Sequence, residues 1–233
     1  MVIRKRFCGP PTSANGGYTA GLIAKYIEGA AQVTLFSPPP LEHPLTIERD
    51  EGGEIALNDG DSTIAVACAT ELVLDVPAPP SYQAAETASE RFSGFDHHLF
   101  PGCFVCGPDR RVSDGLRIFA GPSVMGETVI APWLPDATLT GISNLVKTEF
   151  VWSALDCAGY FACQEGQPRH MLLGRFSAQL VHPIASEKAV IVSGWPLGAE
   201  GRKFYAGTAI HSKEGVLCAK AKAVWILAGT SPA

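Results

Sequence analysis

The chain has 233 residues, of which 46% are hydrophobic and 18% are charged, and its formal net charge is −5. Such a chain can bury a sizeable core and does not have the composition of a disordered protein. The negative charge argues against a general nucleic-acid-binding protein, because contacts with phosphates need a basic surface. No apolar run reaches the roughly 20 residues of a membrane helix and no signal peptide is visible, so we expect a cytoplasmic protein without a membrane segment.

The first half of the chain predicts one helix followed by four strands. After a turn at residues 10–15, the sequence favours a helix over residues 16–28. Strands are predicted at residues 33–36, 45–49, 54–57 and 62–74, and glycine-containing hairpin signals separate the last three. The proline-rich start and polar remainder of residues 77–102 predict a connector that crosses the surface.

The second half repeats this plan. Strands are predicted at residues 116–120 and 127–132, a helix at 148–163, and strands at 172–181, 189–195, 202–211 and 216–227. In each half a long apolar helix precedes a run of antiparallel strands, which predicts an α+β fold with two half-domains, residues 1–76 and 103–233. The seven cysteines are scattered and several lie in apolar segments, so we expect reduced, buried thiols.

The second predicted helix contains a solitary acid. Residues 150–162 are apolar on nearly every face, which is typical of a buried helix, and Asp156 is the one residue among them whose side chain is ordinarily charged at neutral pH. Trp152, Gly159 and Tyr160 are its neighbours one helical turn away, and none is a cation. Burial without a partner raises the pKa of a carboxyl group, as in a general base or carboxylate nucleophile. Alternatively, Asp156 accepts hydrogen bonds from backbone and only stabilises the fold.

The first predicted helix begins with a glycine pair. Ser13 or Asn15 can cap it, and Gly16 and Gly17 then leave backbone N–H groups open to a ligand. Together with the helix dipole, such amides can bind an anion or stabilise the oxyanion that forms on a thioester carbonyl. The alternative is a glycine-rich turn that lets the helix pack closely on its neighbours.

Three segments resemble hotdog-fold thioesterases of the phenylacetyl-CoA type. Residues 103–107, Cys-Phe-Val-Cys-Gly, and the later Gly-Leu at 115–116 resemble the start of these enzymes. Leu-Asp at 155–156 resembles the central-helix motif, and Asn-Gly-Gly at 15–17 resembles the start of that helix. The resemblance implies a double hotdog, in which each half is a central helix wrapped by an antiparallel sheet. It also implies an acyl-CoA substrate, hydrolysis without a cofactor or metal, and assembly into a homo-oligomer.

The family pattern further implies one composite site. In the family, a carboxylate on one central helix works with an N–H at the start of the partner helix, and it lies about eight residues after the first glycine of its own helix. That spacing leads from Gly16 to Ala24, which is no acid, and from Asp156 back to Thr148, where the glycine pair is missing. We therefore expect a fused pseudo-dimer with one working site between the halves and an inactive mirror site at Ala24, Thr148 and Glu149.

Each predicted site residue has a role in this interpretation. Gly16 and Gly17 hold the thioester carbonyl, and Asp156 attacks it or activates a water molecule. The expected substrate-binding residues are Asn15, Tyr18, Trp152 and Tyr160.

Three other interpretations are weaker. Cys103 and Cys106, with His97 and His98 just before them, could bind zinc, but a single CxxC with apolar residues inside it favours buried thiols. Hotdog dehydratases and hydratases place a histidine after the acid, whereas here the next one is His170. A non-catalytic acyl-CoA or lipid-binding protein would keep the pocket and lack turnover.

Overall fold

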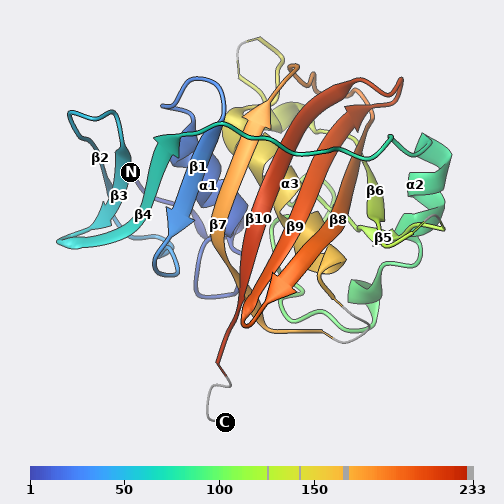
Figure 1. The fold of residues 1–233 in the computed structure, drawn as a ribbon, viewed down its shortest axis with the longest axis horizontal. Coiled ribbons are helices and arrows are strands. Elements are labelled where there is room, and N and C mark those ends of the chain that lie inside the picture. The colour runs from blue at the N-terminus through green and yellow to red at the C-terminus, as the bar shows by residue number, and fades with distance from the viewer. Residues whose placement is uncertain (125, 142, 165–167, 230–233) are drawn as a thin grey trace.

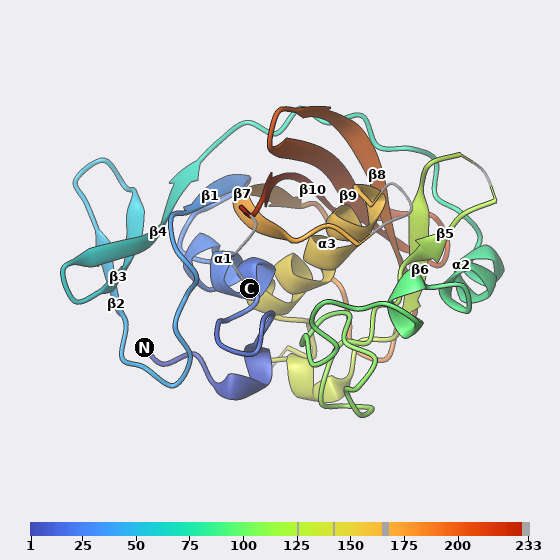
Figure 2. The ribbon, with the colours of Figure 1, turned by 90° about the horizontal axis from the view of Figure 1, so that it is seen from below.

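The computed structural model describes residues 1–124, 126–141, 143–164 and 168–229, which form an α+β fold. The described strands pair antiparallel in a ten-stranded sheet with the order β2-β3-β4-β1-β7-β10-β9-β8-β6-β5. This sheet curves around two central helices, α1 (Gly16–Ala24) and α3 (Thr148–Ala162), as Figures 1 and 2 show. The strands are β1 (Ala31–Leu35), β2 (Thr46–Arg49), β3 (Ile55–Asp59), β4 (Ser62–Ala69), β5 (Gly121–Pro122), β6 (Val129–Trp133), β7 (Met171–Leu180), β8 (Val190–Glu200), β9 (Lys203–Ser212) and β10 (Leu217–Leu227).

The two halves have the same topology. α1 is followed by β1–β4, which lie in the order β1-β4-β3-β2, and α3 is followed by β7–β10, which lie in the order β7-β10-β9-β8. The halves join through their equivalent first strands, because β1 pairs antiparallel with β7 from Ala31 opposite Ala178 to Thr34 opposite Arg175. The repeat expected from the sequence is therefore present in the order of the strands, and β5 and β6 are additions to the second half.

Some predicted boundaries are wrong. The first helix ends at Ala24 instead of residue 28, because the chain turns at residues 25–29, where Gly29 has a φ of 79°. β4 ends at Ala69, although a strand was expected to reach residue 74. Residues 116–120 are not a regular strand, since their backbone bonds to Phe104 and Val105 in single hydrogen bonds and not in a ladder.

The connector at residues 77–102 is more ordered than expected. It contains a helix, α2 (Tyr82–Ser89), and a 3-10 turn at Ser93–Phe95. The Ser81 hydroxyl caps α2 by accepting a hydrogen bond from the Ala84 amide at 3.1 Å. Ala85 and Ala88 are buried in a small cluster with Ile130 of β6 and Ile191 of β8, so α2 covers this end of the sheet.

The two central helices pack unusually closely. A Cβ atom placed on Gly17 would lie 2.6 Å from the Cβ atom of Asp156, and one on Gly21 would lie 2.5 Å from the Cα atom of Glu149. Real Cβ atoms do not approach other atoms so closely, so both positions of α1 require glycine. This contact brings the start of α1 against the middle of α3 and thereby positions the candidate site.

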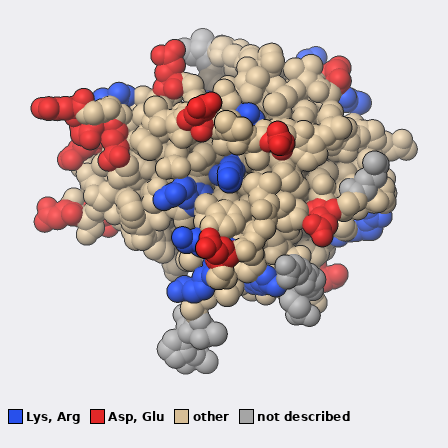
Figure 3. Space-filling view, viewed as in Figure 1, with Lys and Arg blue, Asp and Glu red and all other residues tan. Residues whose placement is uncertain are grey.

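The outer face of the sheet carries mixed charge. Figure 3 shows acidic side chains gathered over the β2–β4 end, and basic side chains interspersed with acidic ones near the centre. No helix in the described part of the chain is long and apolar enough to span a membrane.

Candidate active site

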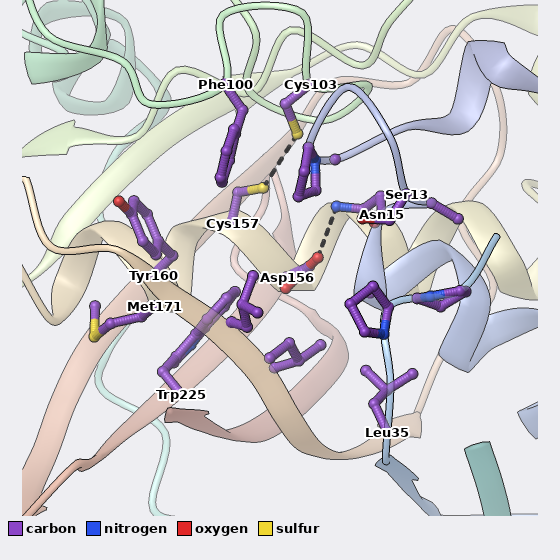
Figure 4. A pocket seen from close by; sticks show the side chains of 18 of the residues that line it. Ser13, Asn15, Leu35, Phe100, Cys103, Asp156, Cys157, Tyr160, Met171 and Trp225 are labelled. Atoms are coloured by element: carbon purple, nitrogen blue, oxygen red, sulfur yellow. Dashed lines mark hydrogen bonds between the residues drawn. The ribbon is translucent and has the colours of Figure 1, made fainter. Parts of the chain in front are cut away.

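A cavity of about 290 Å³ lies where the start of α1, the middle of α3 and the strands β7 and β10 meet (Figure 4). Most of its wall is apolar or aromatic. Its larger side chains include those of Leu35, Phe100, Tyr160, Met171, Leu173 and Trp225. The polar side chains of the wall include Ser13, Asn15 and Asp156, of which the last two are hydrogen-bonded to each other. An apolar chamber with a few polar groups suits a small organic ligand that has one reactive polar group.

Asp156 is buried and accepts two hydrogen bonds from α1. Its Oδ2 atom lies 2.8 Å from Nδ2 of Asn15 and 3.0 Å from the backbone nitrogen of Gly17. Its Oδ1 atom is buried without a hydrogen-bond partner among the described residues. The structure therefore brings Asp156 of α3 into contact with the start of α1.

Burial dominates the electrostatics of this carboxyl group. It raises the pKa of Asp156 to about 7, the donors Gly17 and Asn15 act in the opposite direction, and the nearby Cys103 raises the pKa further. A carboxyl group in this condition can accept or release a proton near neutral pH. The alternative, in which Asp156 only stabilises the fold, accounts for the two hydrogen bonds to Oδ2 and gives no role to the unpartnered Oδ1.

Asn15 both caps α1 and orients Asp156. Its Oδ1 atom accepts a hydrogen bond from the Tyr18 amide at 2.9 Å, while its Nδ2 atom donates to the carboxylate. The carbonyl oxygen of Asn15 also accepts a hydrogen bond from the Thr19 hydroxyl. One side chain therefore links the end of a helix to the acid of another, which fixes the rotamer of both.

The two glycine amides differ. The Gly17 N–H donates to Asp156, so it is occupied and is not open to a substrate carbonyl in this state. The Gly16 N–H makes no hydrogen bond with another described residue, and Gly16 lines the cavity. The first turn of α1 therefore offers one unoccupied amide next to the carboxylate, where the sequence predicted two.

The predicted substrate-binding residues divide into two groups. Asn15 and Tyr160 line the cavity, and the Tyr160 hydroxyl donates to the carbonyl oxygen of Arg169 at 2.8 Å. Tyr18 is buried with its ring stacked on Phe7, and Trp152 is buried against Phe176, so neither lines this cavity. Both belong to the hydrophobic core.

Three cysteines in the wall were not predicted to meet. Cys103 and Cys106 come from the loop before residue 107, and Cys157 follows Asp156 on α3. Hydrogen bonds from the thiols of Cys106 and Cys157 hold the pKa of the Cys103 thiol well below its usual value. Burial and the neighbouring sulfur of Cys103 raise the pKa of Cys106. Among the described residues, this is the group that could hold a metal ion.

The mirror-related position lacks the same groups. Ala24 of α1 is buried and ends in a methyl group, and Glu149 at the start of α3 packs its backbone against Gly21. Lys147 caps α3 without a side-chain hydrogen bond, in contrast to Asn15 of α1. The polar contacts of Asp156 are therefore not reproduced at this position in the described residues.

Comparisons with solved structures identify the fold. A tesB protein of Mycobacterium avium subsp. paratuberculosis is 13% identical with a TM-score of 0.60, covering 93% of this chain and 88% of its own. A hot dog fold protein from Alicyclobacillus acidocaldarius is 11% identical with a TM-score of 0.63, covering 98% of this chain and 92% of its own. The chain has a hotdog fold.

A further hotdog-like neighbour carries an enzyme name. A candidate oleoyl thioesterase from Lactobacillus plantarum is 11% identical with a TM-score of 0.60, covering 98% of this chain and 95% of its own. The sequence itself matches no protein-family model and no curated protein. At this identity the similarity establishes the fold, and the chemistry has to be argued from the site.

Proposed function

We propose that the chain is a double hotdog thioesterase, with one half at residues 1–76, the other at 103–233, and one hydrolytic site between them. The observation that carries the proposal is the contact of the buried Asp156 carboxylate with Asn15 and Gly17 of the other half, at the wall of an apolar cavity. Neighbours of the same fold that are named as thioesterases support it. The substrate proposed is an acyl-CoA, whose acyl group would occupy the cavity.

In the proposed mechanism, the Gly16 amide and the Asp156 carboxylate have different roles. The thioester carbonyl oxygen would lie at the Gly16 N–H, where the positive end of the α1 dipole adds to its polarisation. Asp156, held through Oδ2 by Asn15 and Gly17, would use its unpartnered Oδ1 to take a proton from water or to attack the carbonyl carbon itself. With water as the nucleophile, the tetrahedral intermediate collapses to the acid and the CoA thiolate, which takes up the proton held by Asp156. With Asp156 as the nucleophile, the collapse releases the CoA thiolate and leaves an acyl–Asp156 anhydride, which water then hydrolyses to the acid and the free carboxylate.

A dehydratase or hydratase fits the site less well. Such chemistry needs a histidine whose ring can face the substrate beside the acid, and His98 does line the cavity. However, Nε2 of His98 contacts Sγ of Cys106 at 3.3 Å, and its Nδ1 accepts a hydrogen bond from the Phe100 amide. Both ring nitrogens are therefore engaged away from Asp156, which favours hydrolysis.

Cysteine chemistry also bears on location. None of the seven cysteines, all of which lie in the described part of the chain, forms a disulfide. Unbridged thiols are typical of a reducing compartment, so a cytoplasmic location belongs to the proposal.

The test is hydrolysis of short-chain, long-chain and aromatic acyl-CoAs by the wild type and by Asp156→Asn. The substitution keeps the size of the side chain and removes the base, so we expect kcat to fall about 100-fold or more for the preferred substrate. Asp75→Asn, at an exposed position, is the matched control and should leave kcat unchanged. Full activity of a folded Asp156→Asn enzyme would exclude the mechanism, and tight binding without turnover by the wild type would indicate a non-catalytic acyl-CoA-binding protein.

A further inference from the structure

Three cysteine sulfurs meet beside the proposed site and have no part in hydrolysis. Cys103 and Cys106 lie in the loop of residues 103–107, and Cys157 lies on α3, next to Asp156 in the sequence. Their Sγ atoms all lie within 4.8 Å of one another, and all three residues are buried. Figure 4 shows Cys103 and Cys157 pointing toward each other at the edge of the cavity.

The spacing of these sulfurs matches a thiolate metal site. Tetrahedral zinc with Zn–S bonds of about 2.3 Å needs its sulfurs about 3.8 Å apart. The Sγ atoms of Cys103 and Cys157 are 3.9 Å apart. The sequence separation within the loop, Cys-x-x-Cys, is also one that zinc sites use. Because all three Sγ atoms lie within 4.8 Å of one another, movements of about 1 Å would bring them to the separations of a triangle of zinc ligands.

The loop that carries two of the sulfurs is held firmly. The Gly107 amide donates to the carbonyl oxygen of Cys103 at 2.9 Å, which closes the turn around the two thiols. A Cβ atom on Gly107 would lie 2.4 Å from the carbonyl oxygen of Pro101, so this tight turn requires glycine. The Phe104 amide donates to the carbonyl oxygen of Cys8 and anchors the loop to the N-terminal segment. The ligand positions are therefore formed before any ion binds.

His98 is placed as a hydrogen-bond donor to this group of sulfurs. Because its Nδ1 atom accepts the Phe100 N–H at 2.9 Å, a neutral ring carries its proton on Nε2. Nε2 lies 3.3 Å from Sγ of Cys106, so the ring can donate to a thiolate there. Histidines that ligate through Nε2 donate their Nδ1–H to an acceptor, which is the opposite arrangement. The protein therefore supplies three ligands, and a fourth would have to come from the cavity, which all three cysteines line.

We propose that Cys103, Cys106 and Cys157 bind one Zn²⁺ as thiolates, with a water molecule as the fourth ligand on the cavity side. Binding replaces three S–H protons with the ion and releases them to solvent, which leaves a site of net charge −1. The N–H of His98 offsets part of this charge at Cys106. The ion would tie the loop of residues 103–107 to α3, so that it fixes the wall of the cavity beside Asp156. This inference is independent of the proposed hydrolysis.

Metal content is the direct test. The full chain is expressed with zinc, purified in reducing buffer, gel-filtered, and measured by elemental mass spectrometry. We expect about one zinc per chain, and less than about a tenth of that in Cys103→Ser and in Cys157→Ser. Cys68→Ser removes a cysteine of β4 that lies outside the cluster, and it should keep the wild-type zinc content. Asp156→Asn should also keep its zinc while it loses hydrolysis, which separates this proposal from the proposed function.

Co²⁺ binding to the wild-type protein provides a second test, which does not require any variant to fold. Co²⁺ added to metal-free wild type should produce thiolate-to-cobalt charge-transfer bands and the visible bands of a tetrahedral ion, which zinc then removes. A chelator should release the zinc and expose three additional reactive thiols. Wild-type protein that carries no zinc, gives no cobalt bands and shows seven fully reduced thiols would overturn the proposal. A disulfide between two of these cysteines in freshly purified protein would overturn it as well.

Discussion

The two central helices occupy the same place in a repeated topology, yet they differ in chemistry. α1 begins with Asn15 and a glycine pair and contains no acid, whereas α3 begins without such a pair and carries Asp156. Under the proposed function, each half has kept one part of a site that a symmetric pair would hold twice. The difference teaches that the buried acid depends on its partner helix, since both donors to Asp156 come from α1.

The prediction with the largest expected effect concerns an acid placed at the mirror position, Ala24. Ala24→Asp would bury a carboxylate at a residue that is 3% exposed, without a capping asparagine at the start of α3. We expect it to lower the free energy of unfolding by about 3–5 kcal/mol and to add no hydrolysis, because an uncompensated buried charge is costly. Urea unfolding at neutral pH measures the first effect, and acyl-CoA turnover the second.

Ala24→Asn is the control for volume at that site, since it adds the same number of heavy atoms without charge. It should destabilise the protein clearly less than Ala24→Asp. Wild-type stability of Ala24→Asp, or a gain in turnover, would show that the mirror site is intact and that the halves are not specialised.

The next prediction concerns the close packing of α1 against α3 at Gly17. Gly17→Ala would place a methyl group 2.6 Å from Cβ of Asp156 and 2.9 Å from the carbonyl oxygen of Trp152. The helices would have to separate, and we expect a loss of about 1–3 kcal/mol in the free energy of unfolding, as for other overpacked cores. Gly102→Ala, where a Cβ atom meets nothing within 4 Å, is the control. Equal stability of the two variants would mean that the helix contact is not tight in solution.

The sequence allowed us to predict the contact between Asp156 and the start of α1, but not most of the residues that line the cavity. Asp156 was predictable because it is a solitary acid on an apolar helix, and its glycine partners came from the resemblance to hotdog enzymes. The meeting of Cys157 with Cys103 was not predictable, since 54 residues separate them and only the packing of a loop on α3 joins them. Trp152 was misjudged because helical spacing places a residue near an acid without showing which way its side chain turns.

Two differences from the predicted secondary structure, at α2 and at residues 116–120, arise from tertiary contacts. α2 follows a proline-rich segment that reads as a connector, and its short apolar face of Ala85 and Ala88 becomes significant only against β6 and β8. Residues 116–120 have the composition of a strand, but their hydrogen bonds go to residues 104 and 105 of a loop. The succession of elements along the chain, by contrast, with a helix and then four strands in each half, followed from the sequence pattern.

The prediction with the smallest effect on stability compares the N-terminal caps of α1 and α2. Asn15→Ala removes the cap of α1 and one of the two donors to Asp156, whereas Ser81→Ala removes only the cap of α2. Both should lose about 1 kcal/mol in the free energy of unfolding, the usual cost of a lost cap. Only Asn15→Ala should also reduce kcat for acyl-CoA, because the carboxylate then keeps the Gly17 amide alone and its side chain is free to turn. Equal kcat in the two variants would reduce Asn15 to a structural cap and would leave the Gly17 amide as the sole link that holds Asp156 in place.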